Sequence, residues 1–166
     1  MKTLEEWFAE YSVSHQNVTN KKIHYICVPA IFFSVVGLLM SIPNRGLISL
    51  VHSDNFLYVN WAVAALIPVL FFYLRLSYRM AFYILIFSAL CVIGNFYLAK
   101  IGPLWLSSLI IFAVAWIGQF YGHQIEGKKP SFLKDIQFLL IGPAWILDKW
   151  FSIQSSNGSN GSNGSN

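Results

Sequence analysis

Residues 118–130 read GQFYGHQIEGKKP and lie where a long apolar run ends and a charged segment begins. In a helix, Gln119 and His123 are four residues apart and His123 and Glu126 are three apart, so the three side chains share one face. A row of polar side chains at the end of a membrane span costs free energy, so such residues usually serve a function. The stretch therefore suggests one half of a polar site, and His15 and His24 near the N-terminus are candidates for the other half.

The composition is that of a polytopic membrane protein. Of the 166 residues, 56% are hydrophobic and only 11% are charged, whereas a soluble domain usually has about a quarter of its residues charged. The net charge of +4 is modest, and no basic run alternates with aromatic residues as on a nucleic-acid surface. We expect an all-α membrane protein that binds lipid and not nucleic acid.

Four apolar runs are candidates to cross a hydrocarbon core of about 30 Å. They cover residues 23–42, 56–74, 80–99 and 104–121. A fifth run, residues 132–150, is interrupted by Asp135, Gly142 and Pro143. Its uninterrupted part is too short for a further crossing, so we expect a re-entrant or interfacial helical hairpin there.

The N-terminal residues 1–15 carry Leu4, Trp7, Phe8 and Tyr11 at helical spacing, with charged residues between them. This pattern predicts an amphipathic helix that lies on the membrane surface or against the bundle. We expect residues 1–154 to form a single membrane domain and the Ser/Asn/Gly repeat of residues 155–166 to be an appended linker. Cys27 and Cys91 lie in apolar segments, which predicts buried thiols rather than a disulfide.

The basic residues are distributed unequally between the two sides that four spans would create. Nine fall on the side of the termini and two on the other. The nine are Lys2, Lys21, Lys22, Arg75, Arg79, Lys128, Lys129, Lys134 and Lys149, and the two are Arg45 and Lys100. The positive-inside rule then predicts cytoplasmic termini. The plain composition and short loops favour a bacterial inner membrane, or the endoplasmic reticulum membrane if the source is eukaryotic.

This topology brings His15, His24, His123 and Glu126 to the cytoplasmic boundary and leaves His52 alone on the other side. Imidazole and carboxylate ligands together suit iron or zinc, and two histidines with a carboxylate suit non-haem Fe(II) and O₂. The alternative is a hydrogen-bonded polar cap where helices meet headgroups, and the spacing alone leaves both interpretations open. We interpret His52 as such an interfacial residue.

Other polar residues near this boundary allow two interpretations each. Asn17, Asn20 and Gln119 could orient the histidines by hydrogen bonds, although Asn20 could simply be the N-cap of the first span. Lys21 and Lys128 could attract a fatty carboxylate or lipid headgroups, but positive-inside anchoring explains them without a substrate.

Two motifs resemble those of a known family. The first, Y-x3-H-x-N-x2-N-x2-I-H-x3-V-P, runs from Tyr11 to Pro29, and the second, Q-F-x-G-H-x2-E-x3-P, from Gln119 to Pro130. Together they resemble the 2-hydroxy fatty acid dioxygenases of fungal phytosphingosine breakdown, small multi-span proteins with bacterial relatives. The resemblance implies dependence on Fe(II) and on the motif histidines, here His15, His24 and His123. Glu126 is a candidate further ligand because of its spacing, since it lies on the same helix face as His123.

The implied reaction shortens a 2-hydroxy fatty acid by one carbon: R-CHOH-COOH and O₂ give R-COOH, CO₂ and water. It balances without an external reductant, and no flavin or nicotinamide motif is visible. Two other kinds of protein fit the sequence less well. One is a metal-dependent lipid hydrolase or hydroxylase, and the other is a non-enzymatic membrane scaffold in which the histidines only cap helices.

Overall fold

The computed structural model describes residues 2–13, 15–127 and 140–151, and every regular element within them is a helix. The helices are α1 (Leu4–Ser12), α2 (Val18–Met40), α3 (Arg45–Val51), α4 (Trp61–Leu76), α5 (Tyr78–Leu98) and α6 (Leu104–Glu126). A further helix covers residues 140–151. The prediction of an all-α fold is confirmed for the described part of the chain.

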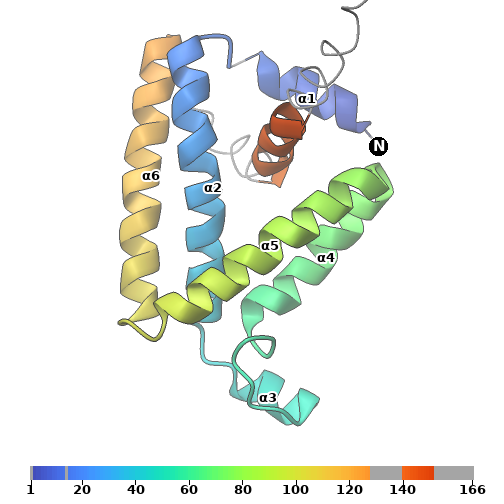
Figure 1. The fold of residues 1–166 in the computed structure, drawn as a ribbon, viewed down its shortest axis with the longest axis vertical. Coiled ribbons are helices and arrows are strands. Elements are labelled where there is room, and N and C mark those ends of the chain that lie inside the picture. The colour runs from blue at the N-terminus through green and yellow to red at the C-terminus, as the bar shows by residue number, and fades with distance from the viewer. Residues whose placement is uncertain (1, 14, 128–139, 152–166) are drawn as a thin grey trace, which may run out of the picture.

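Two helix pairs make the framework of the molecule. Helices α2 and α6 lie side by side along their length, and α4 and α5 form a second pair inclined to the first (Figure 1). The pairs meet where α2 and α5 end and diverge toward the opposite end, where α1 and the helix of residues 140–151 lie between them. We call these the closed end and the open end of the framework.

Of the described helices, three are long and apolar enough to cross a membrane: α2, α5 and α6, with 23, 21 and 23 residues. The predicted span at residues 56–74 is not confirmed as a fourth crossing. It begins at Trp61 rather than at residue 56, because the Asn60 side chain accepts a hydrogen bond from the Val63 amide at 3.0 Å and caps the helix there. The resulting 16 residues extend about 24 Å, less than the usual span.

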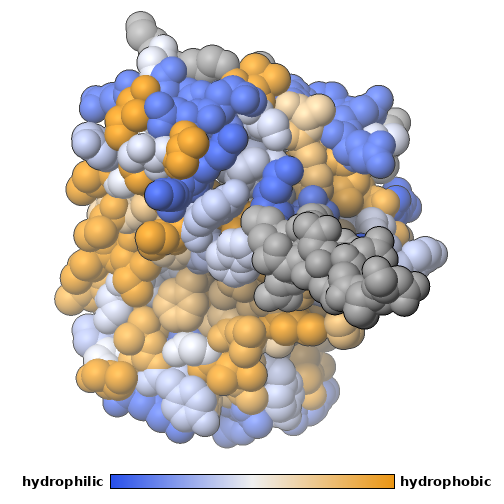
Figure 2. All heavy atoms as spheres, turned by 45° about the horizontal axis from the view of Figure 1, so that its top comes forward, coloured by the Kyte–Doolittle hydropathy of each residue, from blue (hydrophilic) through white to orange (hydrophobic). Residues whose placement is uncertain are grey.

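The surface agrees with a membrane location. Figure 2 shows a hydrophobic band over the flank of the molecule, with hydrophilic residues gathered toward its two ends. Large apolar side chains of α4, α5 and α6 are exposed, among them Ile67, Phe82, Ile93, Val114 and Ile117. Exposed apolar surface on this scale marks a contact with lipid or protein, and together with three candidate spans it indicates a membrane protein.

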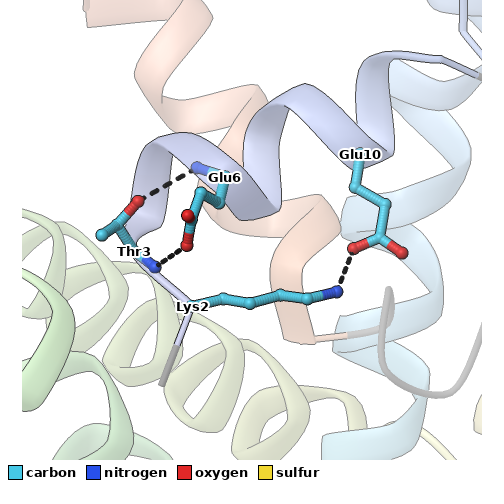
Figure 3. Close-up of polar contacts among 4 residues, drawn as sticks. All are labelled: Lys2, Thr3, Glu6 and Glu10. Carbon is cyan, nitrogen blue, oxygen red and sulfur yellow. Dashed lines mark hydrogen bonds and ion pairs between the residues drawn. The ribbon is translucent and has the colours of Figure 1, made fainter.

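The predicted N-terminal amphipathic helix is present as α1. Thr3 and Glu6 form a capping box at its start: the Thr3 hydroxyl accepts from the Glu6 amide at 3.2 Å, and the Glu6 carboxylate accepts from the Thr3 amide at 2.8 Å (Figure 3). Its apolar side carries Phe8 and Tyr11, which pack into the bundle. The helix therefore packs against the bundle, one of the two positions that its amphipathic pattern allowed.

The helix of residues 140–151 is a buried part of the bundle. Ile141, Trp145 and Ile146 pack against Tyr11 and Val28, and Ala144 and Leu147 pack against α4 and α5. The Trp145 indole N–H donates to the Ser12 hydroxyl at 3.1 Å. This stretch was expected to be re-entrant or interfacial; the described part is helical and fills the space between the helix pairs. Residues 132–139 and the tail 155–166 lie outside the described residues.

Three helices meet at the closed end around Gly37 of α2. The Asn95 amide of α5 donates to the carbonyls of Phe33, at 3.0 Å, and Cys91, at 2.9 Å. A Cβ atom on Gly37 would lie 2.2 Å from both the Asn95 Oδ1 and the Ser108 Oγ. Only glycine therefore fits where α2, α5 and α6 meet. Both cysteines are free thiols, as predicted; Cys91 is buried and Cys27 is half-buried.

Gly37→Ala should destabilise the protein, because overpacking of this kind typically costs about 1–3 kcal/mol. Thermal unfolding in detergent should show a melting temperature lower by several degrees. Gly46→Ala is the control, since a Cβ atom there would have no neighbour within 4 Å. Equal melting temperatures for Gly37→Ala and the wild type would contradict the assigned three-helix contact.

Candidate metal centre

Three histidines from separate parts of the chain meet at the open end. His15 lies in the elbow between α1 and α2, His24 in the second turn of α2 and His123 in the last turn of α6. One potential ligand atom of each lies within 4.8 Å of the other two. All three side chains are buried, with 2%, 1% and 6% of their surface exposed. Burying three neighbouring imidazole rings costs free energy unless their nitrogen atoms form hydrogen bonds or bind a metal ion.

Backbone carbonyls fix the orientation of two of the rings. The His15 Nδ1 lies 2.7 Å from the Tyr11 carbonyl oxygen, and the His24 Nδ1 lies 2.9 Å from the Asn20 carbonyl oxygen. A carbonyl only accepts, so each Nδ1 carries the proton and, in the neutral ring, Nε2 carries the lone pair. Metal-binding histidines are commonly oriented in this way. His15 and His24 are thus prepared to bind an ion through Nε2.

An aromatic wall borders the histidine cluster. The Tyr11 ring stacks on His15 with centroids 4.1 Å apart and planes inclined by 8°. Trp145 lies 5.2 Å from Tyr11 and 6.0 Å from His15, centroid to centroid. Sequence reasoning did not identify either residue as part of the site. The four-residue spacing of Tyr11 and His15 was a usable signal, whereas the contact of Trp145 depends on the tertiary fold alone.

Two glycines bring α6 close to α2 beside the cluster. A Cβ atom on Gly118 would lie 2.6 Å from the Cys27 Sγ, and one on Gly122 would lie 2.4 Å from the Asn20 Oδ1 and 3.4 Å from the His24 Cε1. Small residues four apart are a common means of close helix packing in membranes. Gly122 thereby sets how closely His123, its neighbour in sequence, approaches His24.

Glu126 is not a member of this cluster of potential ligands, although it was expected to be a fourth one. One carboxylate oxygen accepts from the Gln16 amide at 2.8 Å. The other accepts from the Asn17 amide at 2.9 Å and from the Asn20 side-chain amide at 3.0 Å. The carboxylate therefore contacts the start of α2 through both of its oxygens.

The neighbouring polar residues have distinct positions. The cap of α2 is Asn17, whose side chain accepts from the Thr19 and Asn20 amides at 2.8 and 3.4 Å. The suggestion that Asn20 caps the first span is wrong, because α2 begins at Val18 and not near residue 23. Asn20 is instead fully buried, and it hydrogen-bonds both Glu126 and His24.

Of the remaining predicted residues that the structure describes, Gln119 and Lys21 lie at or near this end of the bundle and His52 does not. Gln119 is buried one turn before His123. Lys21 is half-buried in the first turn of α2, and Lys128 lies outside the described residues. His52 ends α3 at the closed end, in a left-handed conformation with φ of 55°. It takes no part in the cluster, as expected.

The fold and the site together define a helical membrane protein with a buried three-histidine centre. The chain belongs to the Mpo1-like family: the family model described as 2-hydroxy-palmitic acid dioxygenase Mpo1-like matches residues 1–152. Comparison with curated proteins and with solved structures gave no match. The matched range holds all three histidines and both motifs, so the resemblance inferred from the motifs is confirmed.

Replacement of any cluster histidine by alanine should weaken metal binding by more than the ~10–100-fold typical of a lost supporting residue. The measurement is metal content after anaerobic loading with Fe(II) and desalting. His52→Asn is the matched control, because asparagine tolerates the left-handed conformation at that position. Unchanged metal content in all three cluster variants would contradict the assignment of the centre.

Gly122→Ala should also weaken metal binding, since the added methyl group would displace the Asn20 side chain, and the Asn20 carbonyl orients the His24 ring. Gly118→Ala provides the comparison, because it adds the same group to the same helix contact one turn away. We expect both variants to lower the melting temperature and only Gly122→Ala to change the metal affinity. Equal affinities in the two variants would show that Gly122 has no specific effect on the centre.

Proposed function

We propose that the protein is an Fe(II)-dependent dioxygenase that shortens long-chain 2-hydroxy fatty acids by one carbon and releases CO₂. The observation that carries the proposal is the buried cluster of His15, His24 and His123, two of them with Nε2 prepared for an ion. The family description, which names a 2-hydroxy-palmitic acid dioxygenase, supports the choice of substrate class.

The donor set fits a first-row transition metal. Two nitrogens that bind one ion at about 2.1 Å each can lie at most about 4.2 Å apart, and the cluster atoms lie within 4.8 Å of one another, so a small inward shift of the rings would suffice. Imidazole suits iron and zinc alike. A reaction with O₂ favours iron, since zinc has no redox chemistry.

The three histidines would hold the iron and leave coordination positions for other molecules. Iron(II), when bound, supplies the redox chemistry through which O₂ reacts with an organic acid. In the net reaction the C1–C2 bond of R-CHOH-COOH breaks, C1 leaves as CO₂ and C2 becomes the new carboxyl carbon. Tyr11 and Trp145 border the cluster and would exclude bulk water from the reacting carbons.

The position of the centre suits an amphiphilic substrate. The cluster lies at the open end of the α2–α6 pair, where α2 begins and α6 ends. The carboxylate and 2-hydroxyl of the substrate would lie at the cluster, while the acyl chain extends toward the bilayer. Lys21, in the first turn of α2, would add electrostatic attraction for the carboxylate, as would Lys128.

Charge asymmetry supports a cytoplasmic location for this end. Among the described residues, Lys2, Lys21, Lys22, Arg75, Arg79 and Lys149 belong to segments at the open end, and Arg45 and Lys100 to segments at the closed end. By the positive-inside rule, this asymmetry favours a cytoplasmic position for the open end. We propose the inner membrane of a bacterium as the location.

The proposal predicts O₂ uptake by the iron-loaded protein in detergent when 2-hydroxypalmitic acid is added, with CO₂ and a fifteen-carbon acid as products. Palmitic acid, which lacks the hydroxyl group, should give no uptake. His24→Ala should abolish the reaction, and His52→Asn should leave it unchanged. Uptake is measured with an oxygen electrode and the products by mass spectrometry.

Two results would overturn the proposal. If no iron remains bound after anaerobic loading and no O₂ is consumed, the histidines are a polar cap of the helix ends. If zinc binds and a lipid ester is cleaved without O₂ uptake, the protein is a metal-dependent hydrolase.

A further inference from the structure

We propose that Glu126 is a positioning residue that holds His15 and His24 in place relative to His123 without binding the metal. The inference rests on the metal centre of the proposed function and not on the reaction that occurs there. It assigns the acidic residue of the second motif a role different from the ligand role expected from the sequence.

The first argument is that both carboxylate oxygens already have donors. Glu126 accepts three hydrogen bonds, of 2.8, 2.9 and 3.0 Å, from a segment 106 to 110 residues earlier in the sequence. Hydrogen bonds to an ionised acceptor are about twice as strong as neutral ones. The carboxylate also lies at the start of α2, where the helix dipole favours negative charge. The atoms that lie close enough together to share one ion are those of the three histidines, and Glu126 is not among them.

The second argument connects the carboxylate to His15. Gln16, whose amide donates to Glu126, follows His15 directly, and the planar peptide bond between them transmits the constraint. On the other side, the His15 amide donates to the Ser12 carbonyl at 3.1 Å, and its ring is held by Tyr11. The elbow that carries His15 is thus anchored to α1 at one end and to α6 at the other.

The third argument connects the carboxylate to His24 through Asn20. The side-chain amide of Asn20 donates to Glu126 at 3.0 Å, and its backbone carbonyl accepts from the His24 Nδ1 at 2.9 Å. Asn20 is fully buried, so it cannot exchange these partners for water at low cost. Glu126 itself lies three residues after His123, on the same face of α6. One carboxylate therefore has a short connection to each of the three histidines.

The experiment is an anaerobic titration of the full chain in detergent with Co²⁺, whose visible spectrum reports both the affinity and the coordination sphere. Glu126→Gln should lower the affinity about 10–100-fold, as is typical for residues that orient ligands. The spectrum of the saturated variant should match that of the wild type, because the ligands are unchanged. A changed spectrum would make Glu126 a ligand and overturn the proposal, as would an unchanged affinity.

A double-mutant cycle with Asn20→Ala separates the positioning role from a general loss of stability. Asn20→Ala removes the donor of the Asn20–Glu126 hydrogen bond, and Glu126→Gln removes the charge of its acceptor, so their combined effect on affinity should be smaller than the sum. Strict additivity would contradict the connection through Asn20. Glu10→Gln is the matched control, an acid on α1 whose carboxylate pairs with Lys2, and should leave the affinity unchanged. Gly37→Ala should lower the melting temperature and leave the affinity unchanged.

The same titration separates the two proposals. If the wild type binds Co²⁺ and Fe(II) but consumes no O₂ with 2-hydroxypalmitic acid, the reaction is wrong and the role of Glu126 is still decided by the spectra. If Glu126→Gln binds as tightly as the wild type, the positioning role is wrong and the dioxygenase proposal stands. A wild-type protein that binds neither ion overturns both.

Discussion

The close contact of α2 with α6 is the constraint on which the other features depend. Gly118 and Gly122 let the two backbones approach at one end, and Gly37 does so at the other, where Asn95 and Ser108 lie against it. Inside a bilayer the hydrophobic effect does not drive helices together, so close packing and hydrogen bonds must do so. The same contact that stabilises the bundle also brings His24 and His123 together. Stability and the candidate site therefore share one set of small residues.

The divergence of the two helix pairs creates space that the rest of the chain fills. Helix α1 and the helix of residues 140–151 pack there against each other and against α2, and Trp145 hydrogen-bonds to Ser12. Without them, His15 would lack its elbow and its aromatic neighbours. A three-helix assembly of α2, α5 and α6 could cross a membrane, but it would hold only two of the three histidines. The shorter elements thus complete the site, while the long ones provide its framework.

Much of this was predictable from the sequence because the signals were local. Apolar runs located α2, α5 and α6, spacing located α1, and the two motifs indicated the three histidines. The differences arose where the choice of capping side chain sets a helix end, and where the tertiary fold decides burial or hydrogen-bonding partners. Asn60 shortens α4 by capping it, and Asn17, not Asn20, begins α2. Residues 140–151 are buried because the helix pairs diverge, and no local pattern carries that information. Glu126 was recognised as important from its position, but its hydrogen-bonding partners lie more than a hundred residues away in the sequence.

The wide separation of the three histidines in sequence has a consequence for the order of events during synthesis. His15 and His24 are made first, and the proposed role of Glu126 would begin only when α6 packs against the start of α2. His123 and Glu126 belong to the last long helix, so the ion-binding arrangement cannot exist while earlier helices are entering the membrane. A nascent chain would thus present isolated imidazoles, which hold metal ions weakly, to the translocation machinery. In the proposed metal centre, loading would therefore follow insertion, and a chain truncated before α6 would not retain the ion.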